Sequence, residues 1–457
     1  MPKGEKINNF QDFQDLAKRE KEIPADFQDL PCPKEKKKDN FQDLQDFAKR
    51  EILAFAREHQ DEDTARLLLS AARYPSIDMP AAVQQIEGLR TAREKWPSLL
   101  DCDDYLYPPR LNREQASSET TARHKVNLLL TPFAKSINPN IDLWITPKAG
   151  VRIADLTGGM GIDTLAFAKV AEHVDYVERD ANLCALMEHN LKALGITNVT
   201  VHCADSMEWL STADTFDLIF IDPARRDSHG RKVAGFEDCT PNILDHAATL
   251  RAHCQKLMVK ASPMIDIDLA CHQLGDVGEV HVVGARGECK EVLFVCGEPS
   301  GEPRIKCVNL NIPNTQNIQN QFSFTRADET AAEGRYCQAV GRHLYEPDAT
   351  LMKGGPFKLI AQRYGLEQLG RNTHLYTADR RIDDFPGRVF EVLQEIQLNR
   401  KEVKTAIPGG KAHVVTRNYP VEAAALQRQL GLKEGGELFV VATTVGTRLS
   451  GFLCKRI

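Results

Sequence analysis

Acidic residues stand at the ends of four successive apolar segments in the middle of the chain: Asp155, Glu178, Asp205 and Asp222. A turn rich in glycine follows the first acid at once and contains Thr157, Gly158, Gly159 and Gly161. Carboxylates accept hydrogen bonds from hydroxyl and amino groups, and glycine lets the backbone approach a ligand closely. One such acid is more often a helix cap, and a glycine turn is often plain punctuation. Four acids in this order predict a site for a nucleotide-like ligand.

The segments that carry these acids alternate between strand and helix patterns. Residues 151–156 alternate apolar and polar positions, and residues 162–169 have apolar residues at helical spacing. Residues 216–221 (FDLIFI) are continuously apolar, as expected of a strand covered on both faces. Repeated strand–helix units predict a parallel, doubly wound α/β sheet whose ligands bind at the carboxyl ends of the strands. Residues 280–299 predict an antiparallel pair that closes this sheet.

S-adenosylmethionine as the ligand gives each of these groups a role. The glycine turn allows close approach to the amino-acid moiety and the ribose, and Asp155 anchors that turn or the ammonium of the ligand. Glu178, 23 positions after Asp155, can accept hydrogen bonds from both ribose hydroxyls, as an acid does in dinucleotide folds. Asp205 can accept a hydrogen bond from the adenine amine. We therefore expect S-adenosylmethionine as the cofactor.

Residues 151–297 resemble a class I S-adenosylmethionine-dependent methyltransferase, with a Rossmann-like sheet. The DPAR sequence that begins at Asp222 is similar to the (D/N)-P-P-x motif of enzymes that methylate nitrogen atoms. The resemblance implies that Asp222 and Pro223 hold the target amine in line with the methyl group, so that catalysis is largely positioning. The chain departs from the motif at two positions, where Ala224 replaces a proline and Arg225 replaces an aromatic residue. Arg225 and Arg226 are instead expected to grip a substrate phosphate.

A longer stretch, from about residue 105 to residue 457, resembles bacterial methyltransferases with a C-terminal THUMP-like domain. The matching motifs are QASSE (115–119), DLTGGMGIDT (155–164), DPARR (222–226), SPM (262–264), GECKE (287–291) and FPGRVF (385–390). The core also resembles trimethylguanosine synthase distantly. Because THUMP domains bind structured RNA, the resemblance implies an RNA substrate.

The distribution of charge agrees with an RNA partner without requiring one. The chain has 457 residues and a net charge of −6, which is no global nucleic-acid signature. Residues 398–457, however, hold ten Lys or Arg and four Asp or Glu, a net charge of +6. A basic end on an acidic body indicates a contact with a polyanion, although an ordinary solvated surface explains it equally well. We expect Lys411 and Arg417 to contact RNA.

Cysteine usage and hydropathy narrow the class of protein further. The twelve cysteines are scattered, with no CxxC pair, so we expect neither a metal site nor disulfide bonds. No stretch is apolar enough to enter a membrane, and we expect a cytoplasmic protein. The oligomeric state is left open by the sequence.

Shifts in composition predict five segments. Residues 1–50 are a low-complexity repeat that we expect to be disordered, and residues 51–130 form a small helical domain. The methyltransferase domain occupies residues 131–300, followed by an α+β, ferredoxin-like domain at 301–380 and the basic THUMP-like domain at 381–457. Between the first domains, tyrosines and arginines of residues 105–113 suit either a nucleic-acid clamp or a packed connector.

The predicted function is methylation of a base nitrogen in structured RNA, either ribosomal or transfer RNA, with the C-terminal domain docking the RNA. A nicotinamide-dependent dehydrogenase shares the G-M-G turn, but its third glycine position holds Thr164 here and DPAR has no role in it. Two alternatives stay open: a methyltransferase of a protein or a small molecule, and a non-catalytic RNA-binding protein with a vestigial cofactor pocket.

The repeat at the start of the chain generates a first prediction. A truncated protein that starts at Lys49 should keep its melting temperature and its affinity for S-adenosylmethionine, because the repeat has too little apolar content to order itself. Thermal unfolding and calorimetry of the two proteins test this, and loss of soluble expression on truncation would contradict it.

Overall fold

The computed structural model describes residues 49–134, 150–224, 235–237, 239–297, 301–310 and 321–457. The described residues up to Ile86 form one compact unit, and those from Glu87 onward form a second. The predicted disorder of residues 1–50 concerns a segment that lies, apart from its last two residues, outside the described residues.

The first unit is helical, as the sequence predicts. Residues 49–58 form a helix, and α3 (Thr64–Leu69), the short 3-10 helix η1 (Ala71–Arg73) and the first part of α4 (Met79–Lys95) follow. Asp63 caps α3 by accepting hydrogen bonds from the backbone N–H groups of Ala65 and Arg66. Pro80 lies in the first turn of α4, where a proline costs no helical hydrogen bond.

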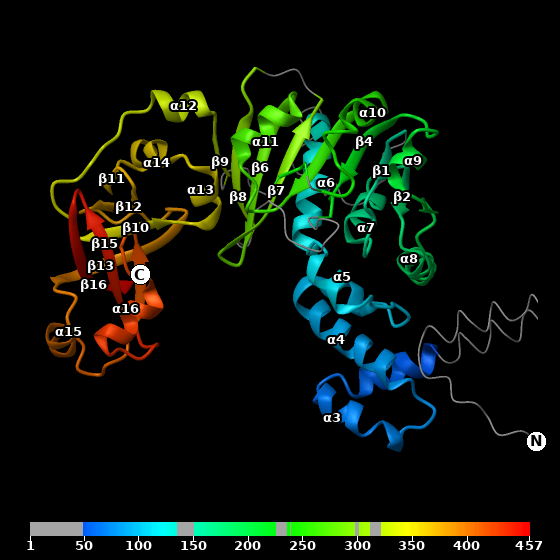
Figure 1. Ribbon diagram of the computed structural model, residues 1–457, viewed down its shortest axis with the longest axis horizontal. Helices are drawn as coiled ribbons and strands as arrows, with labels where there is room; N and C mark the ends of the chain where they lie inside the picture. Colours follow the sequence, from blue (N-terminus) through cyan, green and yellow to red (C-terminus); the bar gives the residue numbers. More distant parts are fainter. Residues whose placement is uncertain (1–48, 135–149, 225–234, 238, 298–300, 311–320) are drawn as a thin grey trace, which may run out of the picture. The chain divides into compact units, whose positions relative to one another are not determined.

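A nine-stranded sheet organises the second unit, with the strand order β3-β2-β1-β4-β5-β7-β6-β8-β9 (Figure 1). Its strands are β1 (Arg152–Asp155), β2 (His173–Glu178), β3 (Val199–Cys203), β4 (Phe216–Ile221), β5 (Cys254–Ala261), β6 (Val277–Ala285), β7 (Glu288–Cys296), β8 (Arg304–Asn309) and β9 (Gln321–Phe324). Strands β1 to β5 are parallel to one another, and β7 runs antiparallel between β5 and β6. This confirms the predicted doubly wound sheet and its closing antiparallel pair.

The pleat of β4 shows why its sequence has no polar face. Leu218 and Phe220 pack with Val126 and Phe167 on one face of the sheet. Their neighbours along the strand, Ile219 and Ile221, belong to the apolar cluster on the other face, where α10 and α11 contribute buried residues. Because successive side chains of a strand point to opposite faces, a strand covered by helices on both faces must be apolar throughout.

The helices of this part of the chain are η2 (Pro97–Asp101), α5 (Arg110–Gln115), α6 (Glu119–Ala134), α7 (Ile162–Ala168), α8 (Ala181–Ala193), α9 (Ser206–Leu210), α10 (Ala247–Ala252) and α11 (Ile267–Leu274). Ser118 caps α6, because its hydroxyl accepts a hydrogen bond from the backbone N–H of Thr121. Asp180 caps α8 in the same way through Asn182. Ser117, the residue before the α6 cap, donates its hydroxyl hydrogen bond to Asp163 instead.

Strands β8 and β9 differ from the expectation that the methyltransferase domain ends near residue 300. Both strands extend the same sheet, with β8 parallel to β6 and β9 antiparallel to β8. Edge strands of this kind are recognised by the strand they pair with, which a local sequence pattern does not reveal. The glycine and proline at 301–303 indicate a linker and so hide the continuation of the sheet. The domain limits themselves stay a prediction.

A second sheet of seven strands lies C-terminal to the first, in the order β11-β12-β10-β13-β16-β15-β14. Its strands are β10 (His343–Pro347), β11 (Glu367–Gly370), β12 (Thr373–Ala378), β13 (Gly387–Ile396), β14 (His413–Arg417), β15 (Leu438–Val445) and β16 (Arg448–Arg456). The accompanying helices are α12 (Arg326–Ala331), α13 (Ala349–Gly354), α14 (Phe357–Tyr364), α15 (Arg400–Ala406) and α16 (Ala423–Leu430). β14 and β15 are parallel and are joined through α16, so they form a strand–helix–strand unit.

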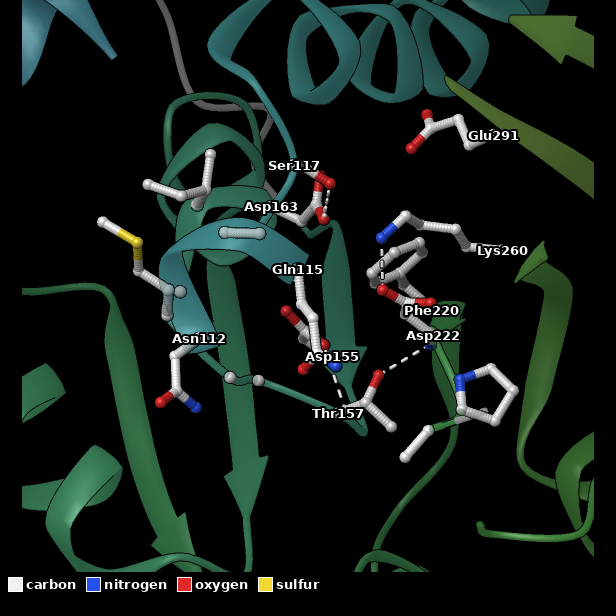
Figure 2. A pocket seen from close by; sticks show the side chains of 18 of the residues that line it. Asn112, Gln115, Ser117, Asp155, Thr157, Asp163, Phe220, Asp222, Lys260 and Glu291 are labelled. Carbon is white, nitrogen blue, oxygen red and sulfur yellow. Dashed lines mark hydrogen bonds and ion pairs between the residues drawn. The ribbon is translucent and has the colours of Figure 1, made fainter. Parts of the chain in front are cut away.

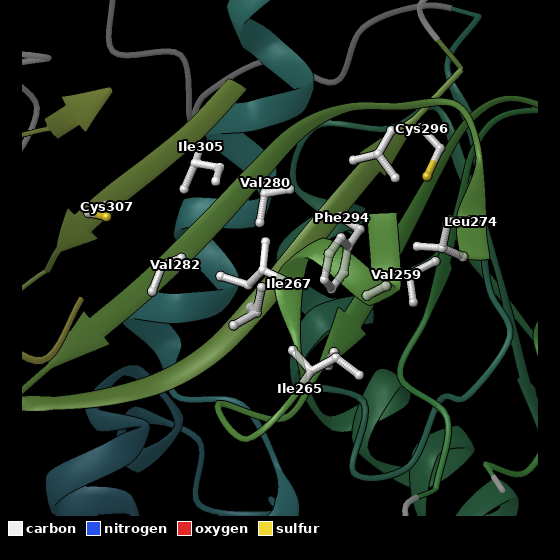
Figure 3. Packing of buried hydrophobic residues seen from close by; sticks show 14 of the residues in the cluster. Val259, Ile265, Ile267, Leu274, Val280, Val282, Phe294, Cys296, Ile305 and Cys307 are labelled. Atoms are coloured by element: carbon white, nitrogen blue, oxygen red, sulfur yellow. The ribbon is translucent and has the colours of Figure 1, made fainter. Parts of the chain in front are cut away.

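One apolar core runs from the first sheet into the α13–α14 region. Figure 3 shows residues of β5, β6, β7 and α11 packed over one face, among them Val259, Ile267, Val280 and Phe294. The same cluster includes Leu351 of α13, with further members in α14 and β10. Among the described residues, no helix has the length and apolar character needed to cross a membrane.

Candidate functional site

A cleft of about 1700 Å³ lies at the carboxyl ends of the parallel strands. The residues that follow β1, β2, β3, β4 and β5 line it, together with the α5–α6 segment (Figure 2). All four acids that the sequence singles out, and the whole glycine turn, are among the lining residues. The predicted constellation is therefore brought together at one edge of the sheet.

The glycine turn has little room for side chains. A Cβ atom on Gly158 would lie 2.1 Å from the ring of Tyr176, and the hydroxyl of this tyrosine donates a hydrogen bond of 2.7 Å to the carbonyl of Gly159. Gly161 caps α7 with φ +83°, a conformation that strains other residues. The turn is thus packed from behind by β2, and its open side faces the cleft.

Asp155 is buried and already fully engaged within the protein. Its Oδ2 accepts a hydrogen bond of 2.6 Å from the hydroxyl of Thr164, and its Oδ1 accepts one of 3.2 Å from the backbone N–H of Thr157. Burial raises the pKa of the Asp155 carboxyl to about 7. These contacts favour the first of its two predicted roles, anchoring the turn, over a contact with the ammonium of the ligand.

Glu178 holds the other side of the turn. Its Oε2 accepts a hydrogen bond of 3.0 Å from the N–H of Gly159, and its Oε1 accepts one of 3.0 Å from the N–H of Asp180. A carboxylate has about four acceptor positions, so each oxygen keeps one for a ligand hydroxyl.

Asp205 is an exposed helix cap at the end of β3. Its Oδ1 accepts hydrogen bonds from the N–H groups of Met207 and Glu208, the first two bonds that α9 needs. This is the ordinary role of an acid at such a position. Since Asp205 also lines the cleft, its contact with the adenine amine stays a prediction.

Asp222 is tied to the glycine turn and to a buried lysine. Its backbone N–H donates a hydrogen bond of 2.7 Å to the hydroxyl of Thr157, and its Oδ2 forms an ion pair with Lys260 at the end of β5. Lys260 is only 5% exposed. Burial by itself lowers the pKa of Lys260, but Asp222, Glu291 and Asp163 outweigh it, so the pKa lies above its ordinary value. Lys260 is therefore a permanent cation beside Asp222.

A second buried lysine stands behind the cleft. The ammonium of Lys125, on α6, is fully buried and lies 3.0 Å from Asp163 and 3.0 Å from Glu291. Ser117 completes the cluster by donating a hydrogen bond of 2.6 Å to Asp163. Burial alone raises the pKa of Asp163, but the nearby Lys125 and Lys260 lower it further than burial raises it.

Sequence reasoning did not assign a role to Lys125, Asp163, Lys260 or Glu291. A signal for two of them was available in the sequence, because a charged residue in an apolar strand needs a buried partner. Lys260 lies within KLMVKAS, and Glu291 begins the apolar run EVLFV. The QASSE and GECKE motifs contain Ser117 and Glu291, and the structure joins these motifs through Lys125. We name Lys125, Lys260, Asp163, Glu291, Asp222 and Ser117 the buried charge cluster.

The predicted substrate contacts lie apart from the cleft or outside the described residues. Lys411 and Arg417 are not among the residues that line the cleft, and Arg417 forms an ion pair with buried Glu346. Arg225 and Arg226 fall outside the described residues.

Tyr105 and Tyr107, which suited either a nucleic-acid clamp or a connector, are both buried and pack edge to face. Of the two readings, the packed connector is therefore the one that the structure supports. Within the part of the chain that the structure describes, no three His, Cys, Asp or Glu residues gather as metal ligands would.

Models of three protein families match the chain. Residues 136–228 match protein-L-isoaspartate(D-aspartate) O-methyltransferase, residues 343–386 match a ferredoxin-like domain, and residues 387–456 match a THUMP domain-like family.

Similar proteins cover most of the chain. An uncharacterized S-adenosylmethionine-dependent methyltransferase of Mycobacterium tuberculosis (strain H37Rv) is 26% identical over 352 residues, which are 75% of this chain and 87% of that protein. A crystal structure of a protein assigned as a methyltransferase from Porphyromonas gingivalis W83 has a TM-score of 0.74 and 29% identity, and covers 89% of this chain and 98% of that one. A shorter match is the 23S rRNA (uracil(1939)-C(5))-methyltransferase RlmD of Hahella chejuensis, 30% identical over 138 residues, 26% of this chain and 31% of that protein.

The strand order, the glycine turn and the acids around it, together with these relatives, define a class I S-adenosylmethionine-dependent methyltransferase. More narrowly, the chain is a methyltransferase whose residues 387–456 match the THUMP domain-like family.

The residues present fit S-adenosylmethionine. The turn is closed toward β2, where a Cβ on Gly158 would strike Tyr176, and faces the cleft on its other side. Glu178 retains free acceptor positions at the end of β2, where a ribose binds in dinucleotide folds.

Loss of the Glu178 carboxylate should weaken binding of the cofactor. Glu178→Ala strands two ribose hydroxyls and releases the N–H of Gly159, so we expect S-adenosylmethionine to bind about 1–3 kcal/mol more weakly. Isothermal calorimetry measures this directly, and an unchanged affinity would remove Glu178 from the site.

The buried charge cluster should govern stability. Lys125→Met leaves Asp163 and Glu291 without their buried cation, and such changes cost about 3–5 kcal/mol. We expect a clearly lower melting temperature than for Lys169→Met, which removes an exposed lysine at the end of α7. Equal melting temperatures for the two variants would show that the cluster contributes little.

Proposed function

We propose that this methyltransferase modifies a nitrogen atom of a base in structured RNA, either ribosomal or transfer RNA, and that its C-terminal domain docks the RNA. The observation that carries the proposal is the Asp222–Lys260 pair at the edge of the cofactor cleft. The cofactor supplies the methyl group as an electrophile, and the chain has to present a nucleophile to it.

The pair favours a target that donates a hydrogen bond. Lys260 occupies Oδ2 of Asp222, and Oδ1 is left for an incoming donor. An amine that gives its N–H to Oδ1 and to the carbonyl of Pro223 has its lone pair directed away from both. Alignment of this kind accounts for much of the rate of a methyl transfer.

Two other kinds of target fit the cleft less well. A carboxylate, the group that the matched isoaspartate methyltransferase family modifies, would face the negative charge of Asp222. The C5 carbon of uracil, the atom named for the matched RlmD enzymes, needs activation by a nucleophile such as a thiolate. No cysteine occurs among the described residues that line the cleft. Both observations support nitrogen as the target atom.

Support for RNA comes from the C-terminal domain. It matches the THUMP domain-like family and carries the +6 segment that the sequence shows. Lys411 and Lys433 are both exposed and adjacent, paired across an isolated parallel bridge. Like charges held side by side are unfavourable unless an anion joins them. A phosphate of the RNA backbone is such an anion.

Arg417 is a less direct phosphate ligand than Lys411. Its guanidinium pairs with Glu346, which also binds Arg388, so part of its charge is already balanced. We therefore assign Arg417 mainly to the support of this face of the domain and place the docking contact at Lys411 and Lys433.

Asp222→Ala should abolish methyl transfer and leave cofactor binding nearly intact, because it removes alignment at the reacting centre. We expect a loss of about 100-fold or more with bulk RNA from cells that lack the gene, measured with radiolabelled cofactor. Full activity of this variant would reject the role of Asp222. No transfer to RNA by the wild-type protein, with transfer to a protein fraction, would reject RNA as the substrate.

The docking role has a separate test. Lys411→Ala/Lys433→Ala should weaken RNA binding and reduce its salt dependence without changing cofactor affinity, as expected for phosphate contacts. Lys169→Ala/Lys192→Ala, which removes two exposed lysines at the ends of α7 and α8, is the matched control. Equal RNA affinity of the two double variants would contradict docking at Lys411 and Lys433.

A further inference from the structure

The four strand-end acids leave one end of the cofactor without a partner. Glu178 and Asp205 lie where the ribose and adenine are expected, and Asp222 faces the target. Asp155, the remaining acid, is 1% exposed and has both oxygens engaged by Thr164 and Thr157. The amino-acid end of S-adenosylmethionine, a carboxylate and an ammonium on one carbon, needs other polar groups.

The segment between α5 and α6 presents a polar side chain at this place. Arg113 is buried and paired with Glu87, and Ser117 is buried and bonded to Asp163. Gln115, midway between these two anchored residues, is exposed and lines the cleft. Figure 2 shows its side chain directed into the cleft, toward Asp155 and Thr157 of the glycine turn.

The backbone that carries Gln115 is fixed before any ligand binds. Lys95 donates hydrogen bonds to the carbonyls of Arg113 and Glu114 at the end of α5, at 2.9 and 3.2 Å. The indole N–H of Trp96 donates one of 2.7 Å to the carbonyl of Ser117. Rigid support of this kind is what a positioning residue requires, because less freedom is lost on binding.

The amide of Gln115 suits a zwitterion. It has two N–H donors for a carboxylate and one carbonyl acceptor for an ammonium. Within the described part of the chain, this amide makes no hydrogen bond, so its donors and acceptor are available. Since it is neutral, it also adds no charge beside Asp163 and the rest of the buried charge cluster.

We propose that Gln115 binds the amino-acid end of S-adenosylmethionine and so fixes the direction in which the methyl group points. This role concerns the cofactor and is independent of the nature of the substrate. It also gives the QASSE motif a function: Ser117 anchors the segment and Gln115 makes the contact.

The test compares two ligands that differ only at this end. S-adenosylhomocysteine has the amino-acid group, and 5′-methylthioadenosine lacks it. Calorimetry without RNA should show that Gln115→Ala binds S-adenosylhomocysteine about 10- to 100-fold more weakly, as for a lost hydrogen bond to a charged group. Its affinity for 5′-methylthioadenosine should stay within about twofold of wild type. Gln115→Glu should weaken the binding of S-adenosylhomocysteine at least as much, because it places a carboxylate next to the carboxylate of the ligand.

Two controls make the result specific. Gln362→Ala removes an exposed glutamine of α14 that is not among the cleft residues, and should change neither affinity. Glu178→Ala should weaken the binding of both ligands by the same factor, because both contain the ribose. An equal loss of both ligands in Gln115→Ala, no loss of either, or tighter binding of S-adenosylhomocysteine by Gln115→Glu would each overturn the proposal. Any of these results would leave the proposal of an RNA substrate unaffected, because the measurements contain no RNA.

Discussion

The architecture of the active site depends on neutralising a fully buried lysine. Lys125 cannot remain charged in the interior unless carboxylates surround it, and it has two, Asp163 at the start of α7 and Glu291 on β7. These partners come from two separate elements, one on the helix that follows the glycine turn and one on a strand distant in the sequence. The requirement to satisfy one ammonium therefore fixes α6 against the sheet and, with α6, the segment that covers the cofactor cleft. Lys260 repeats the arrangement one strand away with Asp222.

The parts of the fold that a local pattern determines were predictable. The continuous apolar run of β4, the caps Ser118 and Asp180, and the parallel β14–β15 unit follow from periodicity and capping chemistry. The relation of Asp155, Glu178, Asp205 and Asp222 was equally predictable, because parallel strands bring their carboxyl ends to one edge. The buried charge cluster was not, since its members are brought together by pairing of β5 with β7 and by packing of α6 on α7.

The sequence was also silent about which acids are free to act. Asp155 and Asp222 look alike as residues at the ends of apolar strands, yet one is closed off by Thr164 and the other opens to the cleft. The difference arises because the hydroxyl of Thr164, nine residues after Asp155, binds Asp155, whereas Lys260, 38 residues after Asp222, pairs with Asp222. A local motif shows neither partner. Likewise, β8 and β9 have no distinctive composition, and the pairing of β8 with β6 and of β9 with β8 is what shows that the first sheet continues.

Thr157 connects the glycine turn after β1 to the loop after β4. It lies in the glycine turn, and its hydroxyl accepts a hydrogen bond from the backbone N–H of Asp222, in the loop that follows β4. A shift of one loop therefore either breaks this hydrogen bond or moves the other loop with it. Such a coupling is reciprocal: whatever factor the cofactor adds to the affinity for the target, the target adds to the affinity for the cofactor.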